Sequence, residues 1–315
     1  MQPSGNTTVT KVRIGEEQAG QRLDNFLFRQ LKGVPKSRVY RMLREGEVRV
    51  SGRRAKPDYK LEAGDEVRIP PVRVAEKAET PSAPPHRFSK PLLDRVIYRD
   101  DALLVVDKPG GQAVHGGSGV SLGIIEQLRM ELPDARFLEL AHRLDKETSG
   151  VLVLALKRSA LVELHRMLRE GEAKKCYLTL AAGDWRDAVR HVKLALHKYT
   201  TESGERRVVA DEEGRHAHTI FRLKRKLGGF SLLEAELKTG RTHQIRVHLA
   251  TLQHPIVGDE KYGDFELNKA LRKRGLKRMF LHAARMEMRH PLTGAPLVLE
   301  SPLPADLSGF LDSLD

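Results

Sequence analysis

A proline-rich stretch, residues 70–91, most constrains how this chain can fold. The sequence PPVRVAEKAETPSAPPHRFSKP holds six of the chain's 16 prolines and has neither a helical nor an alternating apolar pattern. Proline fixes φ and removes a backbone donor, so such a segment favours a semi-extended tether at ~3 Å per residue. We therefore expect the 315 residues to fold as two domains joined by a linker.

Composition narrows the class of protein. The chain is 40% hydrophobic, enough to build a core, and its net charge of +13 with a pI of about 9.8 favours polyanionic partners. Its one cysteine, Cys176, excludes an internal disulfide and a four-cysteine zinc site, which fits a reducing cytoplasm. No apolar run approaches the roughly 18 residues of a membrane span, and MQPSGNTTVT lacks the order of a secretory signal. We expect a cytoplasmic protein without a membrane partner.

Before the linker, the sequence predicts a helix followed by short strands. SRVYRMLREG indicates a helix with Ser37 as its N-cap and Gly46 just past its end, and strands are expected at 48–50 and 67–69. At about 100° per residue, the apolar and basic side chains of this helix separate onto opposite faces. The apolar face consists of Val39, Met42 and Leu43.

The basic face of the helix continues into the residues that follow it. Nine basic residues but two acidic ones, Glu45 and Glu47, lie between Lys32 and Lys56. A solvated polar face is the simpler alternative, yet so little compensating acid favours a surface that binds phosphate. The residues expected to form it are Arg38, Arg41, Arg44, Arg49, Arg53, Arg54 and Lys56.

Residues 20–69 resemble a known module. Their R-L-D opening, basic second helix and G-x-V-x-V-x-G strand are similar to those of the S-four type RNA-binding domain. The resemblance implies a small domain over residues 20–82, with its core at 20–69, that binds structured RNA. Residues 83–91 would then be the end of the linker, and residues 92–315 a second domain.

After the linker, strand-like and helix-like segments alternate. The pattern of apolar residues predicts strands at 102–109, 150–156, 175–183, 218–226 and 229–238, and helices at 121–132, 159–171 and 242–253. Several strands follow one another with too little helix between them for a purely parallel sheet. We expect an α+β domain around a mixed, largely antiparallel sheet.

The chain lacks the motifs of several common catalytic sites. There is no G-x-x-x-x-G-K-[ST] phosphate loop. His243 and His248 are five residues apart, which leaves them about 140° apart on a helix and unsuited to share a metal ion. We expect no metal site, and the carboxylate in HRLDKETSG, residues 142–150, becomes the candidate reactive group.

That carboxylate, Asp145, lies between the apolar runs FLEL and VLVLAL, in a short loop expected to join two buried strands. A turn or N-cap aspartate is the simpler interpretation. The flanking cations Arg143 and Lys146 favour the ionised form, and an ionised carboxylate on a rigid scaffold can act as a nucleophile or base. With no second acid in the motif, covalent catalysis fits better than two-acid glycoside hydrolysis.

Four stretches of the second domain resemble one enzyme family. HRLDKETSG, with DKPGGQAVHGG upstream and KKCYLTL and GRTHQIRVHLATLQHPIVGDEKYG downstream, is similar to the ribosomal and transfer RNA pseudouridine synthases, and these strings cover most of residues 100–264. The S-four type domain in front makes the chain most like the large-subunit group. The resemblance implies isomerisation of uridines in large-subunit (23S) ribosomal RNA by a monomer, without a cofactor.

The resemblance also implies roles for single residues. Asp145 would be the catalytic carboxylate, which attacks the sugar or the base or abstracts a proton. Arg246 would pair with it, and Tyr177 would stack on the flipped base. Arg143 would fill the gap that the base leaves in the RNA, and Ile245 would pack against the base pocket. The simpler interpretations are a half-buried strand tyrosine for Tyr177 and a surface helix arginine for Arg246.

Two other functions compete with this one. The chain could be a non-catalytic RNA-binding ribosome assembly factor, although the set of Asp145, Tyr177 and Arg246 argues against it. It could also be a nucleoside hydrolase or glycosylase that releases free base. Such an enzyme should hold a water beside a second acid, for which the sequence offers no motif.

Overall fold

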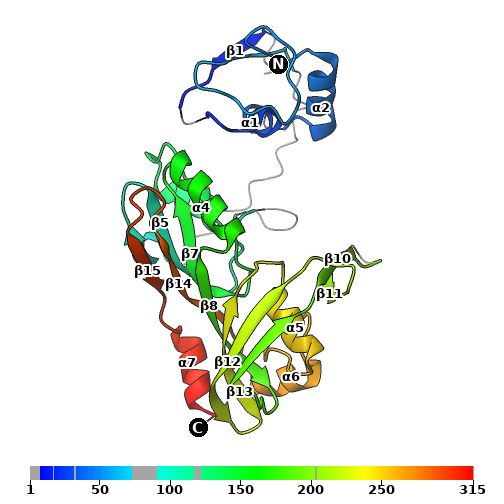
Figure 1. Cartoon of the computed structure of the whole chain (residues 1–315), viewed down its shortest axis with the longest axis vertical. Helices are drawn as coiled ribbons and strands as arrows, with labels where there is room; N and C mark the ends of the chain where they lie inside the picture. The colour runs from blue at the N-terminus through cyan, green and yellow to red at the C-terminus, as the bar shows by residue number, and fades with distance from the viewer. Residues whose placement is uncertain are drawn as a thin grey trace, which may run out of the picture. The chain divides into compact units, whose positions relative to one another are not determined.

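The chain divides into two compact units, Met1–Ser89 and Lys90–Asp315 (Figure 1). The computed structural model describes residues 8–16, 18–31, 33–72, 91–116, 122–202 and 204–314. Most of the proline-rich stretch, residues 73–90, lies outside the described residues, so the extended linker stays a prediction.

The first unit combines a small sheet with two helices. Its strands pair antiparallel in the order β1 (Thr10–Arg13), β3 (Glu66–Ile69) and β2 (Arg49–Val50). Helices α1 (Leu23–Gln30) and α2 (Lys36–Glu45) share one apolar core with the sheet.

Helix α2 has the two faces that its sequence predicts. Val39, Met42 and Leu43 are buried in the core, whereas Arg41 and Arg44 are exposed. Gly46 ends the helix in the left-handed region with φ of 76°, where glycine has no steric penalty.

The predicted N-cap of α2 was wrong. The helix begins at Lys36, with Pro35 in the cap position, and Ser37 lies inside the first turn. The carbonyl of Pro35 accepts the first hydrogen bonds, from Arg38 N at 2.9 Å and Val39 N at 3.2 Å. Proline has no side-chain oxygen, so it cannot cap the first N–H groups as serine would, and its backbone carbonyl makes these contacts instead.

The second unit is built on a ten-stranded mixed sheet. Its strands are β4 (Val96–Arg99), β5 (Leu103–Lys108), β6 (Glu139–Leu140), β7 (Ser149–Ala155), β8 (Lys174–Ala182), β9 (Val189–Lys193), β12 (His218–Leu227), β13 (Phe230–Leu237), β14 (Leu281–Arg289) and β15 (Pro296–Glu300). The main order is β4-β5-β7-β14-β8-β13-β12-β9, with β15 beside β14 and β6 beside β7. Among the described pairings β14–β7 is parallel and the others are antiparallel, which confirms the predicted class.

The helices of the second unit are α3 (Ile124–Glu131), α4 (Arg158–Glu170), α5 (Gln244–Thr251), α6 (Phe265–Lys273) and α7 (Ala305–Asp312), with a 3-10 turn η1 at Leu93–Arg95. All eight strands and helices predicted for this unit are present. Among the described residues, no helix combines the length and apolar character needed to cross a membrane.

The sequence did not predict β14, which lies in the middle of the sheet between β7 and β8. In its sequence, LHAARMEMR, charged and apolar residues alternate only over the last five positions, and the segment is rich in good helix formers. Pairing with a neighbour on each side outweighs this local preference, because strand formation depends strongly on tertiary context.

Strand β7 separates two apolar cores. All seven of its residues are buried. Leu152 and Leu154 belong to a core that includes residues of α3 and α5, whereas Val151 and Val153 belong to one that includes Leu164 of α4. Alternate strand residues point to opposite faces, so β7 is covered on both sides.

A two-stranded hairpin projects from the second unit (Figure 1). It consists of β10 (Leu196–Thr200) and β11 (Arg206–Ala210). At its base, Leu196 and Val208 pack with Val247 of α5 in a small apolar cluster. The hairpin is thereby attached to the helix that carries Arg246.

Candidate active site

Asp145 lies in the short loop between β6 and β7. Strand β7 is fully buried and β6 is half-buried, so the loop starts and ends on elements of the sheet. Thr148 N donates a hydrogen bond of 3.2 Å to Asp145 O, which closes the turn around the aspartate. A carboxylate held in this way has little freedom to move, which a catalytic group requires.

A buried lysine holds this loop from behind. Lys108, at the end of β5, is 0% exposed, and its Nζ donates to the carbonyl oxygens of Pro109 (2.8 Å), Lys146 (3.0 Å) and Thr148 (2.7 Å). Burial lowers the pKa of Lys108 to about 7. The three carbonyls match the three donors of an ammonium group, so Lys108 ties the loop around Asp145 to the end of β5.

Arg246, in the first turn of α5, pairs with Asp145. Its Nη1 donates to Asp145 Oδ2 at 2.9 Å, across 101 residues of sequence. The side chain of Arg246 is 11% exposed and that of Asp145 is 23% exposed, so water screens the pair only in part. Among the described residues, Oδ1 of Asp145 has no hydrogen-bond partner.

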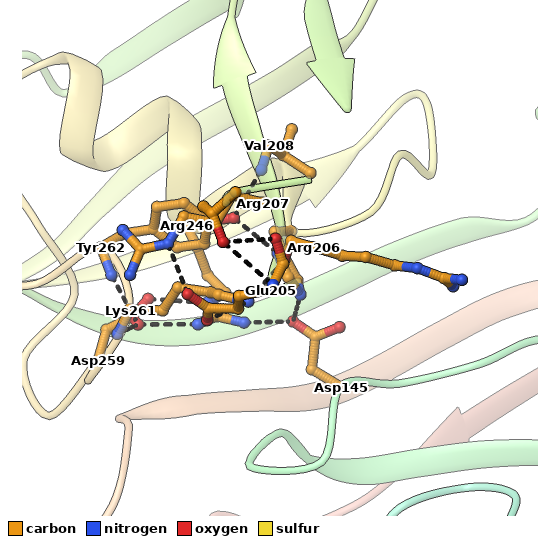
Figure 2. Close-up of polar contacts among 11 residues, drawn as sticks. Asp145, Glu205, Arg206, Arg207, Val208, Arg246, Asp259, Lys261 and Tyr262 are labelled. Carbon is orange, nitrogen blue, oxygen red and sulfur yellow. Dashed lines mark hydrogen bonds and ion pairs between the residues drawn. The ribbon is translucent and has the colours of Figure 1, made fainter. Parts of the chain in front are cut away.

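A second carboxylate orients Arg246. Asp259 accepts from Arg246 Nε at 2.7 Å and from Nη2 at 2.8 Å, so the guanidinium is held in a two-bond fork while its third nitrogen meets Asp145 (Figure 2). The Asp259 side chain is 1% exposed. Burial opposes its ionisation, but hydrogen bonds from Arg246 and from the backbone of Lys261 and Tyr262 lower its pKa.

His243 lies next to this pair and is neutral. Its backbone is left-handed, with φ of 53°, just before α5, and its Nε2 lies 3.8 Å from Asp145 Oδ2. Burial lowers the pKa of His243 to about 4. Tyr262 Oη lies 2.8 Å from His243 Nδ1. It also accepts a hydrogen bond from Val208 N at 3.0 Å (Figure 2). Tyr262 therefore links the hairpin to the ring beside Asp145.

Tyr177 and Ile245 form an apolar wall of the same pocket. Tyr177, on β8, is 8% exposed and Ile245, on α5, is 4% exposed, and both belong to one apolar core. Burial, and then the charge of Asp145, raises the pKa of the Tyr177 hydroxyl. The hydroxyl therefore stays protonated at neutral pH, and the ring is available as an uncharged surface.

The pocket has a volume of about 560 Å³. Its lining brings together Asp145, Tyr177, Ile245 and Arg246, and Arg143 also lines it with an exposed side chain. The other polar residues of the lining come from the Asp145 loop, α4, β8 and the segment before α5: His142, Thr148, His165, Arg169, Lys175, Lys238, Thr239, Arg241, Thr242, His243 and Gln244.

The basic residues predicted to bind phosphate in the first unit differ in whether an acidic side chain already pairs with them. Arg38 donates two hydrogen bonds of 3.0 Å to Glu47, so its charge is already paired. Arg44, Arg54 and Lys56 instead line a shallow hollow of about 510 Å³ together with the exposed ring of Tyr40. Arg41, Arg49 and Arg53 are exposed on the same unit.

Within the described residues, no group of three or more histidine, cysteine, aspartate or glutamate side chains could hold a metal ion. His248 is fully buried in α5, with Nε2 3.3 Å from Leu194 O and no partner for Nδ1.

Sequence reasoning missed several residues that shape the site. Lys108, Asp259 and Tyr262 lie in the strings DKPG and GDEKYG, which marked the family resemblance without showing what each side chain does. A local signal for Asp259 does not exist, because its importance follows from the buried fork that it forms with Arg246.

We expect the protein to lose stability as the pH falls from about 6.5 to about 4. Burial lowers the pKa values of His142, His243 and His248 to about 4, whereas the unfolded chain has histidines near 6.5. As the pH falls, the histidines of the unfolded chain take up protons before those of the folded protein do. The stability that comes from keeping these three histidines neutral is therefore fully present above pH 6.5 and is lost as the pH falls toward 4. The upper limit is ~3 kcal/mol for each histidine.

Urea unfolding at pH 7, 5.5 and 4.5 measures this loss. The variant His248→Leu removes one of the three buried groups and should flatten the pH dependence. An unfolding free energy that stays constant across this range would contradict the prediction.

Comparisons with known proteins identify the family of the chain. Residues 102–251 match the family model described as RNA pseudouridylate synthase, and residues 21–67 match the S4 domain. A protein of Salmonella typhi named ribosomal large subunit pseudouridine synthase C is 51% identical over 309 residues, which cover 98% of this chain and 97% of that protein. A protein of the same name from Haemophilus influenzae is 46% identical over 98% of this chain and 96% of its own length.

Two solved structures of RNA pseudouridylate synthase domain proteins are also similar to this chain. The structure named Human RNA Pseudouridylate Synthase Domain Containing 4 superposes with a TM-score of 0.59 at 27% identity, over 71% of this chain and 94% of that chain. Human RNA Pseudouridylate Synthase Domain Containing 1 gives 0.57 at 29% identity, over 70% and 85%. The chain therefore belongs to the RNA pseudouridylate synthase family, as an isomerase that carries an S4 domain in front of its catalytic domain.

Proposed function

We propose that this protein converts specific uridines of large-subunit (23S) ribosomal RNA into pseudouridine, with Asp145 as the catalytic carboxylate. The observation that carries the proposal is the pairing of Asp145 with Arg246 at 2.9 Å in a pocket walled by Tyr177. Relatives over nearly the full length of the chain are named ribosomal large subunit pseudouridine synthase C, which supports the choice of RNA.

The carboxylate is suited to a reaction that breaks and remakes one bond. Arg246 holds Oδ2 of Asp145 by a charge-assisted hydrogen bond, which leaves Oδ1 to react with the nucleotide. The bond between C1′ of the sugar and N1 of the base breaks, the uracil turns within the pocket, and carbon 5 joins C1′. Carbon 5 then loses its hydrogen as a proton to water, and N1 gains a proton. Because the RNA gains and loses no atoms overall and is not oxidised or reduced, the proposal invokes no cofactor.

The pocket must accept a base that has left the RNA stack. Flipping a nucleotide costs a few kcal/mol, which contacts in and around the pocket have to offset. We assign stacking of the uracil to Tyr177, an apolar contact to Ile245, and replacement of the flipped base to Arg143. The exposed position of Arg143 at the pocket and the flat guanidinium support this last role.

We propose that residues 20–82 bind the RNA and that residues 92–315 carry out the reaction, with residues 83–91 as the end of the linker. Residues 83–90 of that linker lie outside the described residues. The exposed cations of α2 and the hollow beside Tyr40 support phosphate binding by the first domain. Arg38 contributes less than its neighbours, because Glu47 already pairs with it.

Mapping pseudouridines in large-subunit ribosomal RNA from cells with and without the gene tests this function. The proposal expects one or more pseudouridines to disappear in the deletion strain and to return with the wild-type gene. Purified protein should release tritium from 5-tritiated uridine RNA without free uracil. Free base would indicate a glycosylase, and RNA binding without tritium release would indicate an assembly factor.

Activity should depend on the presence of an aromatic ring at position 177. Tyr177→Phe keeps the stacking surface and is expected to retain most of the turnover. Tyr177→Ala removes the ring from a buried wall and should lower kcat/KM by ~10- to 100-fold, the scale of one base–aromatic contact. Tritium release from both variants measures this, with melting temperatures as the control for folding. Equal activity of the two variants would rule out a stacking role.

A further inference from the structure

The catalytic pocket contains a buried cation, Lys175, to which the proposed reaction assigns no role. Lys175 precedes Tyr177 by two residues on β8, so the two side chains leave the strand on the same face. It is 8% exposed and lines the pocket. Its Nζ lies 3.9 Å from where a Cβ on Gly240 would be, so the ammonium reaches the segment that precedes α5.

Within the described part of the chain, no acidic group balances the charge of Lys175. Among the described residues, its ammonium has no hydrogen bond and no ion pair. The residues opposite it are apolar, Leu237 on β13 and Met286 on β14. Burial lowers its pKa accordingly. The buried Lys108, by contrast, donates hydrogen bonds from its ammonium group to three carbonyl oxygens.

The other cations of the pocket wall are either paired or exposed. Lys238 pairs with Glu236, Arg241 donates to the carbonyl of His216 at 3.1 Å, and Arg143 is exposed to solvent. Among the described residues that line the pocket, Asp145 is the one carboxylate, and Arg246 already binds it. The charge of Lys175 is therefore available to an anionic ligand.

We propose that Lys175 binds a phosphodiester group of the RNA strand, next to the flipped uridine. This rests on the proposed function, because a strand that delivers a uridine to Tyr177 brings its flanking phosphates to the same pocket. A phosphate oxygen accepts strong charge-assisted hydrogen bonds from an ammonium group and provides the negative charge that the chain does not. Lys175 is then a positioning residue, which fixes the nucleotide relative to Asp145.

Replacement by an uncharged side chain of similar length tests this. Lys175→Met should raise KM for an in vitro transcript of large-subunit ribosomal RNA, and its Kd in filter binding, by ~10-fold or more, with a smaller effect on kcat. The slope of log Kd against log salt should become shallower by ~0.7 to 0.9, the value for one phosphate contact. The melting temperature should equal or exceed that of wild type, because an unpaired buried charge is removed.

Lys174→Met is the matched control. Lys174 is the neighbouring residue on β8, but its side chain is 46% exposed and pairs with Glu287 at 3.1 Å. The Lys174→Met substitution removes the same charge as Lys175→Met and should leave KM and Kd near the wild-type values. Wild-type binding and salt dependence in Lys175→Met, or a lower melting temperature, would overturn the proposal. If the wild-type protein released no tritium, the proposed function would fail, and filter binding would still decide whether Lys175 contacts phosphate.

Discussion

Asp145→Asn should abolish pseudouridine formation while the protein still folds and binds RNA. Asparagine has nearly the same shape but cannot ionise, so it can neither attack the nucleotide nor accept a proton. Loss of a reactive group of this kind lowers kcat by about 10⁴-fold or more in well-studied enzymes. The fold should persist, because Asp145 is 23% exposed and Arg246 keeps its two hydrogen bonds to Asp259.

Tritium release, filter binding and melting temperature measure the three parts of this prediction. Glu147→Gln is the control, since Glu147 lies in the same loop but does not line the pocket. It should keep near wild-type turnover. Turnover by Asp145→Asn above about 1% of the wild-type rate would remove Asp145 from its assigned role.

Arg246→Lys is expected to lower kcat by about 100-fold with little change in KM. A lysine keeps the positive charge but has one nitrogen, so it cannot meet Asp145 and both oxygens of Asp259 in fixed directions. The carboxylate of Asp145 would then be poorly aimed, and misplacement of a reactive group by about 1 Å can cost about 100-fold. Tritium release under single-turnover conditions measures the step directly.

Arg246→Met should be less stable as well as inactive. It leaves Asp259, 1% exposed, without its cation, and breaking such a buried pair costs ~3–5 kcal/mol. Adding Asp259→Asn removes the stranded charge, so the double variant should regain much of the unfolding free energy but none of the turnover. Urea unfolding of the single and double variants tests this. A single variant as stable as wild type, or a double variant with restored turnover, would contradict this account of Arg246.

Local sequence was enough to predict much of the fold. The faces of α2 follow from helical spacing, because side chains three and four residues apart share a side. Buried strands such as β7 and β5 follow from continuous apolar runs. The N-cap of α2 and the strand β14 could not be predicted in this way, because proline geometry and pairing with two neighbouring strands outweighed the side-chain signals.

By itself, the sequence determined that the chain is basic, that it is divided by a proline-rich stretch, and which strings carry the family resemblance, because these are properties of composition and order. Only the tertiary structure decided which of those residues meet. It brings Arg246 to Asp145 across 101 residues, adds Asp259 as the buried partner of the same guanidinium, and leaves Lys175 buried without one. Charge pairing and desolvation depend on distances through space and on burial, and neither is written in local sequence.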